Sequence, residues 1–226
     1  YSGIYYLESR GYRPEEIFRI GKTLKNKAKR YYTVDNSIYE NRKSAGNVID
    51  KEAGILNRGN LTRLKNFLNR AAQGERLTVG FIGGSITQGF AATAPDKCYA
   101  ARTVAWLRKV FPNTEFDYVN AGIGATDSQF GAARVQEDLL QRLPDLVMVE
   151  FSVNDHCTPH DMETYEGLIR QIYGSRSCPA MVLLHSVYYD TGKSAAYYHA
   201  QIGRHYDLPC ISMQNSIYPA VAEGKL

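Results

Sequence analysis

The stretch Leu77-Thr-Val-Gly-Phe-Ile-Gly-Gly-Ser-Ile-Thr-Gln-Gly89 decides how this chain folds. Residues 77–82 form a short apolar run of the length that is typical of a buried β-strand. Glycines flank Ser85 on the turn that follows this run. A turn of this kind exposes a nucleophile at the end of a strand, although serine is also a favoured residue for capping a helix, so both interpretations stay open for Ser85.

Apolar runs alternate with amphipathic segments through the rest of the chain. We predict strands over Leu77–Ile82, Glu115–Asn120, Leu146–Phe151, Ala180–Leu184 and Cys210–Ser212. We predict helices over Asn60–Ala72, Tyr99–Phe111, Gly131–Leu143, Met162–Tyr173, Ser194–Tyr206 and Gln214–Ala222. Strands that alternate with helices favour a parallel sheet covered on both faces. The fold class is therefore predicted to be α/β, a three-layer α/β/α sandwich around a five-stranded parallel sheet.

The charge divides the 226-residue chain into two parts. Residues 1–48 hold ten Lys and Arg against five Asp and Glu, together with seven of the 17 tyrosines, whereas residues 49–226 are nearly neutral. We predict an accessory segment over 1–48, with a helix from Arg13 to about Arg30, and a globular domain over 49–226. Such a segment could mediate self-association or contact an acidic polymer, but solvated charges are the simpler interpretation, and no nucleic-acid partner is predicted.

Composition and spacing argue against a membrane span, a metal site and a nucleotide site. No run approaches the roughly 20 apolar residues that cross a membrane. Four cysteines lie far apart without a CxxC pair, which favours free buried thiols over a zinc site: Cys98, Cys157, Cys178 and Cys210. Phe90 follows Gly89 where a P-loop needs Lys, and Asp127 stands where a dinucleotide fingerprint needs its third glycine. We predict neither cofactor nor metal. The compartment, cytoplasmic or secreted, stays open.

Two later loops, Asn120–Asp127 and Val149–Asp155, also follow strand-like runs. The carboxyl ends of parallel strands meet at one edge of a sheet, so these loops should converge with Ser85. A serine that attacks a carbonyl needs preorganised hydrogen-bond donors for the oxyanion that forms. The candidate donors are the N–H of Ser85, the N–H groups of Gly124 and Ala125, and the amide of Asn154. For Asn154 an Asx-turn that ends the strand is the alternative.

The segment around Ser85 resembles a motif of the SGNH hydrolases, also called GDSL esterases. Gly83-Gly-Ser-Ile-Thr87 is similar to their first block, with Gly84 in place of Asp. The common GxSxG motif of lipases does not fit, because Thr87 stands where its second glycine belongs. The resemblance extends from about Leu77 to Leu226. It implies a flavodoxin-like sheet and Ser85 as the nucleophile.

The other two loops resemble the second and third blocks of the same family. Counting from Asn120 places Ala125, beside Gly124, at the glycine whose N–H the family uses for the oxyanion. Ser152-Val-Asn-Asp155 is similar to the third block, with Ser152 in place of Gly. The resemblance implies Asn154 as the side-chain donor. From the residues, Asp127 is expected to cap the next helix and Asp155 to orient its loop.

The fourth block of the family, Asp-x-x-His, is not found. None of the five histidines has an Asp three residues before it. In the family this block follows the last strand, so we expect a domain truncated at its C-terminus. His156, His160 and His185 could approach the site, but surface or satisfied polar roles are expected for them.

The resemblance implies a metal-independent serine esterase that acts on small acyl esters, preferably acetyl esters of carbohydrates. Aryl esters, lysophospholipids and thioesters stay open as substrates, since nothing in the sequence defines the acyl pocket. The alternative from another class is a noncatalytic pseudo-esterase or carbohydrate-binding module that has lost its base. A carbohydrate ester is thus the expected partner, with no nucleic acid or membrane, and self-association is expected to involve residues 1–48.

Overall fold

A computed structural model describes residues 48–226, which form one unit. The predictions for the accessory segment, including its helix from Arg13 and its part in self-association, lie outside the described residues. No helix within 48–226 is both long and apolar enough to cross a membrane.

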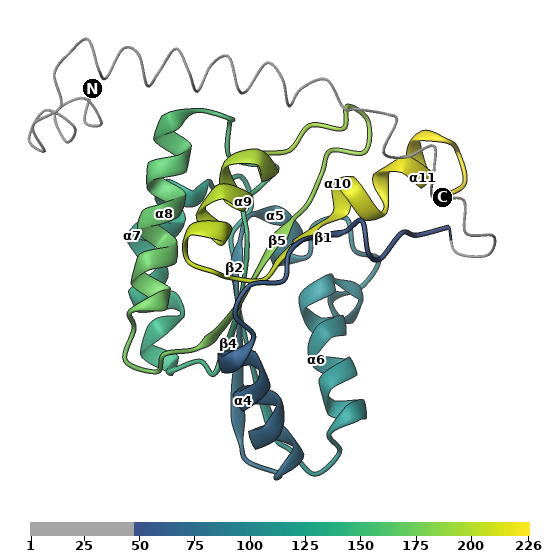
Figure 1. Cartoon of the computed structure of the whole chain (residues 1–226). Coiled ribbons are helices and arrows are strands. Elements are labelled where there is room, and N and C mark those ends of the chain that lie inside the picture. Colours follow the sequence, from purple (N-terminus) through teal and green to yellow (C-terminus); the bar gives the residue numbers. More distant parts are fainter. Residues whose placement is uncertain (1–47) are drawn as a thin grey trace, which may run out of the picture. The chain divides into compact units, whose positions relative to one another are not determined.

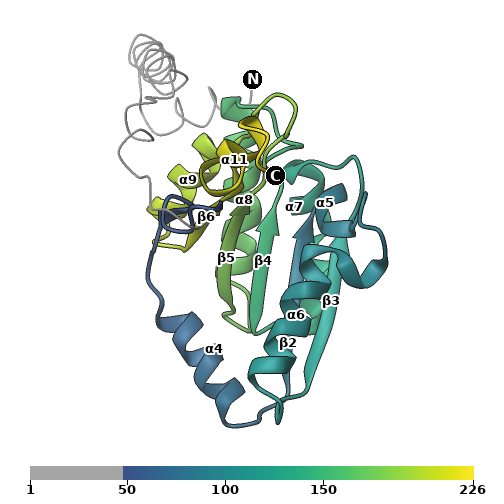
Figure 2. The ribbon, with the colours of Figure 1, turned by 90° about the vertical axis from the view of Figure 1, so that its right-hand side faces the viewer.

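Six strands form a single sheet in the order β1-β6-β5-β4-β2-β3 (Figure 2). Their bounds are β1 Ile55–Asn57, β2 Leu77–Gly83, β3 Phe116–Gly122, β4 Leu146–Glu150, β5 Ala180–His185 and β6 Cys210–Ser212. Strands β2 to β6 are parallel and have the strand order of a flavodoxin-like sheet, which confirms the predicted class. Strand β1 pairs antiparallel with β6. It was not predicted, because three residues are too few to show a periodicity.

Helices cover both faces of the sheet (Figure 1). Their bounds are α4 Thr62–Ala72, α5 Ser85–Gln88, η1 Pro95–Lys97, α6 Tyr99–Val110, α7 Ser128–Asp138, η2 Leu140–Arg142, α8 Pro159–Tyr173, α9 Ala196–His205, α10 Met213–Ser216 and α11 Tyr218–Ala222. The long helices α7, α8 and α9 lie on one face, and α4 and α6 on the other. The three layers are therefore those expected from the alternation of strands and helices.

Three predicted helices differ from the observed ones by more than two residues. Helix α8 begins at Pro159 and not at Met162, because Thr158 caps it by accepting the N–H of Asp161. Helix α7 begins at Ser128, because Asp127 caps it by accepting the N–H of Phe130 at 2.9 Å, as expected for Asp127. The helix predicted over Gln214–Ala222 is two short helices, α10 and α11. Pro219 lies in the first turn of α11, where its missing N–H is tolerated. In one continuous helix over Gln214–Ala222, Pro219 would leave a backbone hydrogen bond unmade.

The core has one cluster on each face of the sheet. Val79 and Phe81 of β2 pack with α4 and α6, whereas Ile82 packs with α7 and α8, because successive strand residues face opposite sides. All four cysteines are free thiols, as predicted. The expectation that they are buried holds for Cys98 and Cys210. Cys157 is half-buried, and Cys178 lies exposed after α8.

Candidate functional site

Ser85 is the first residue of α5, and this helix follows β2 at its carboxyl end (Figure 2). The N-cap of α5 is Gly84, and no side chain caps this helix. The interpretation of Ser85 as a helix cap is therefore wrong. Ser85 is partly buried and lies at the edge of the sheet where the three predicted loops are expected to meet.

Two glycines at the strand ends let α5 lie directly on the sheet. Gly83 and Gly122 are register partners at the ends of β2 and β3. A Cβ on Gly83 would lie 2.1 Å from Oγ1 of Thr87, and a Cβ on Gly122 would lie 2.2 Å from the main-chain N of Gln88. Both distances are far below van der Waals contact. The position of α5, and of Ser85 on it, thus depends on the absence of side chains at these two residues.

The Asn154 amide lies against the backbone of the serine turn. A Cβ on Gly84 would be 2.3 Å from Oδ1 of Asn154 and 3.3 Å from its Nδ2. Oδ1 is buried and has no hydrogen-bond partner, so Asn154 does not form the Asx-turn considered as its alternative. Nδ2 is on the side of the amide farther from Gly84. Glycine is required at position 84 because this amide occupies the space that any side chain would need.

The second loop brings Gly124 close to Ser85. The two candidate main-chain donors, the N–H groups of Gly124 and Ala125, differ in their hydrogen bonds. A Cβ on Gly124 would lie 3.7 Å from the Cβ of Ser85. The N–H of Gly124 donates to Oε1 of Gln88 at 2.9 Å. The N–H of Ala125 has no acceptor among the described residues, and Ala125 has a φ of 58°. This is the left-handed region that glycine adopts without strain, which fits a position where the family has glycine.

Asp155 holds the Asn154 loop to two helices, as expected of a residue that orients a loop. This carboxylate is buried. Oδ1 accepts the N–H of Ser128 at 2.8 Å, at the start of α7, and Oδ2 lies 2.9 Å from Nε2 of His199 on α9. His199 stacks on the ring of Tyr165 with 3.6 Å between centroids. The sequence offered no signal for His199 or Tyr165, because their contacts join residues that are distant in the chain.

No described histidine forms a hydrogen bond with Ser85. His156 is exposed, His160 is bonded through Nε2 to Oε1 of Gln129 at 3.1 Å, and His199 is bonded to Asp155. His185, at the end of β5, is fully buried and both its ring nitrogens lack partners, so the expectation of a satisfied polar role is wrong for it. Burial, followed by the nearby His199, lowers the pKa of His185 well below its ordinary value.

Glu150, at the end of β4, is a buried carboxyl group that sequence reasoning missed. Its Oε1 accepts the N–H of Ser152 at 3.1 Å and lies 3.0 Å from the Ser152 hydroxyl, whereas Oε2 has no partner. Burial raises the pKa of Glu150 to about 7, against the opposing effect of the bonds from Ser152. The Ser152 hydroxyl also lies 3.0 Å from the carbonyl of Ser186. Serine in place of the family's glycine thus has a polar role here.

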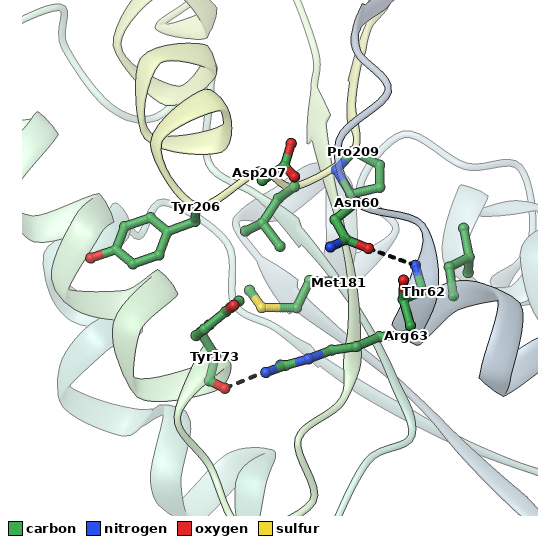
Figure 3. Close-up of a pocket in the computed structure, with 10 residues that line it drawn as sticks. Asn60, Thr62, Arg63, Tyr173, Met181, Tyr206, Asp207 and Pro209 are labelled. Carbon is green, nitrogen blue, oxygen red and sulfur yellow. Dashed lines mark hydrogen bonds between the residues drawn. The ribbon is translucent and has the colours of Figure 1, made fainter.

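Two hollows lie at different edges of the sheet. One, of about 280 Å³, is drawn in Figure 3, where Arg63 reaches across it to the carbonyl of Tyr173. It is lined by Met181 near the start of β5 and by Pro209 just before β6, so it opens at the amino ends of the strands, opposite to Ser85. The other hollow, of about 400 Å³, includes Ala125 and the first turns of α7.

Comparison with known proteins defines the class of this chain. The model of the GDSL-like lipase/acylhydrolase family matches residues 81–214, more than half of the chain. The chain belongs to this family.

Two solved structures are similar over most of the described domain. Both are of a two-domain esterase (CEX) active on acetylated mannans, one of them co-crystallised with mannopentaose. Each is 52% identical with a TM-score of 0.78, and the match covers 79% of this chain but 49% and 48% of theirs. The chain thus spans about half of the length of these structures. No match was found among curated proteins.

The pKa of Glu150 predicts a loss of stability as the pH rises. Its folded pKa of about 7 exceeds the ordinary value of 4.5, so between these values the folded state binds a proton that the unfolded state lacks. The raised pKa contributes roughly 3 kcal/mol to the free energy of unfolding. This contribution is complete below pH 4.5 and is lost as the pH rises through 7. Urea unfolding of wild type and Glu150→Gln at pH 4.5, 6 and 8 measures it. The variant should lack this part of the decline, and parallel pH profiles would contradict the prediction.

The buried contacts of Asp155 predict a large loss of stability in Asp155→Ala. The substitution leaves the N–H of Ser128 and Nε2 of His199 without their acceptor in the interior. We expect a cost of about 3 kcal/mol, because both groups lose a charge-assisted bond in a dry site. Asp127→Ala, which removes only the cap of α7, is the matched control and should cost about 1 kcal/mol. Equal losses in chemical denaturation would show that the Asp155 contacts contribute no more than a cap.

Proposed function

We propose that this chain carries the nucleophile and oxyanion hole of a serine esterase that removes acetyl groups from carbohydrates. One observation supports this above the others: Ser85, the Asn154 amide and the Gly124-Ala125 turn lie together at the carboxyl edge of the sheet. Neither Ser85 nor Asn154 has the local structural role that would otherwise explain it. The family match and the two similar esterase structures support the same reaction class.

In the proposed reaction, Oγ of Ser85 attacks the acetyl carbonyl while a base takes the hydroxyl proton. The carbon–oxygen bond to the sugar then breaks, and the sugar oxygen receives that proton as it leaves. Water attacks the acetyl-serine with the same base, which releases acetate and restores Ser85. In the family the base is the histidine of the Asp-x-x-His block, and within residues 48–226 no histidine is hydrogen-bonded to Ser85.

The developing oxyanion would accept hydrogen bonds from three donors. We assign them to the N–H of Ser85, the N–H of Ala125 and Nδ2 of Asn154. Ala125 is preferred to Gly124, because the N–H of Gly124 is already bonded to Gln88. For Gly124 to serve instead, the Gln88 side chain would have to leave it.

Acetylated carbohydrate is the proposed substrate because the two similar structures are of an esterase active on acetylated mannans. The second candidate function is a carbohydrate-binding module without catalysis. It is favoured by one observation, the lack of a bond between Ser85 and any described histidine.

Activity of the full chain separates these two functions. Ser85→Ala should abolish release of acetate from acetylated mannan and of nitrophenol from p-nitrophenyl acetate, since no other group forms the acyl intermediate. Asn154→Ala should lower kcat roughly 100-fold or more, the size expected for one oxyanion donor. Asn113→Ala, an exposed turn residue, is the control for Asn154. Wild-type rates in Ser85→Ala would rule out this mechanism, and a full-length protein that is inactive but binds mannan would favour the binding module.

The contact between Gly84 and Asn154 predicts a coupled pair of substitutions. The Cβ of Gly84→Ala would displace the Asn154 amide, so kcat should fall about as far as in Asn154→Ala. Once Asn154 is Ala, the space is open, and adding Gly84→Ala should cost little more. Gly167→Ala is the matched control, because a Cβ there meets nothing within 4 Å. Additive losses in kcat would mean that Gly84 acts independently of Asn154.

A further inference from the structure

The hollow beside the second loop lies next to the proposed oxyanion donor Ala125. We call it the α7 hollow. It is lined by Ala125, Thr126, Asp127, Gln129, Phe130 and Ala133, and has a volume of about 400 Å³. Ala125 follows Gly124, and a Cβ on Gly124 would lie 3.7 Å from the Cβ of Ser85. A group bound in the hollow would therefore lie beside the reacting ester.

We propose that the α7 hollow binds a sugar ring of the acetylated carbohydrate, with the Phe130 ring as the surface on which the sugar stacks. This inference rests on the proposed function and specifies how that function would recognise its substrate. A site of this kind would make the enzyme prefer acetyl groups on carbohydrate to acetyl groups on other alcohols.

The composition of the hollow suits a sugar better than an acyl chain. Phe130 is 49% exposed and, with Ala133, forms an apolar wall. Asp127 and Gln129 add a carboxylate and an amide at the same hollow. A sugar ring has an apolar C–H face and a rim of hydroxyl groups that donate and accept hydrogen bonds, so it matches one aromatic wall with polar neighbours. An acyl chain would offer no hydrogen bond to the second carboxylate oxygen of Asp127 or to the amide nitrogen of Gln129.

The aromatic wall is held in place relative to the serine turn. The guanidinium of Arg134 lies 5.7 Å from the centre of the Phe130 ring, within the range of a cation–π contact. Arg134 is itself buried, and its Nη2 donates to the carbonyl of Gly83 at 3.2 Å, two residues before Ser85. Asp138 fixes the other end of the guanidinium at 2.8 Å. One side chain thus contacts both the proposed sugar platform and the strand that presents the nucleophile.

The polar groups of the hollow are also fixed before any ligand binds. Asp127 accepts the N–H of Phe130 through Oδ1, which anchors the start of α7. The Gln129 amide is bonded to Nε2 of His160 at 3.1 Å. Groups that are already ordered lose little entropy on binding, which favours affinity. The hollow in Figure 3 lacks this relation to Ser85, since it lies at the opposite edge of the sheet.

The test compares two substrates in variants of the full chain. Phe130→Ala should lower kcat/KM for acetylated manno-oligosaccharides about ten-fold more than kcat/KM for p-nitrophenyl acetate, mainly through KM. Phe130→Trp, which keeps an aromatic surface, should restore most of the preference. Trp106→Ala is the matched control, because Trp106 is 57% exposed on α6, on the other face of the sheet from α7 (Figure 1). It should leave the ratio unchanged.

A binding measurement tests the sugar site independently of catalysis. In the Ser85→Ala background, calorimetry with mannopentaose should show about ten-fold weaker binding when Phe130 is also Ala. Equal losses on both substrates, or unchanged mannopentaose binding, would overturn the sugar site. If Ser85→Ala keeps wild-type activity, the proposed function itself fails. If Ser85→Ala is inactive and Phe130→Ala keeps the wild-type ratio, only the sugar site fails.

Discussion

The absence of side chains at the ends of two neighbouring strands is the constraint on which the site depends. Gly83 and Gly122 sit side by side in the sheet, and α5 packs on both at distances that no Cβ would permit. Because the strands are parallel and in register, this close approach places the start of α5 at the carboxyl edge of the sheet. Ser85 therefore owes its position to backbone packing, and its own side chain remains available for chemistry.

Buried polar contacts add the rigidity that the proposed oxyanion hole would need. The Asp155 carboxylate joins the loop after β4 to the start of α7 and, through His199, to α9. Asn154 and the turn with Ala125 are thus connected through one buried group. In a low-dielectric interior such bonds are strong when made and costly when broken, so the proposed donors would keep their arrangement without a substrate. Preorganised donors of this kind lower the barrier because they need not reorient during the reaction.

Most of the fold was predictable because strands buried on both faces are continuous apolar runs. Strand β1 was not, since its place depends on pairing with β6 and not on its own pattern. The three loops of the site could be located because parallel topology brings strand ends together. The contact that distinguishes Ala125 from Gly124 and the contact of His199 with Asp155 join residues far apart in the chain. Glu150 bonds only to nearby Ser152, but its burial depends on the packing of the whole sheet. Local periodicity contains no information about such contacts.

The antiparallel edge has a consequence for the order in which this domain is completed during synthesis. Ile55 of β1 pairs with Ile211 of β6, and the N–H of Asp50 donates to the carbonyl of Ser216. The ribosome makes β1 before every parallel strand, yet its partner strand emerges last. Until then the backbone groups of β1 that pair with β6 lack their partner strand, and closing so long a loop delays the pairing further. Among the strands of residues 48–226, the first to be made is therefore the last that can join the sheet.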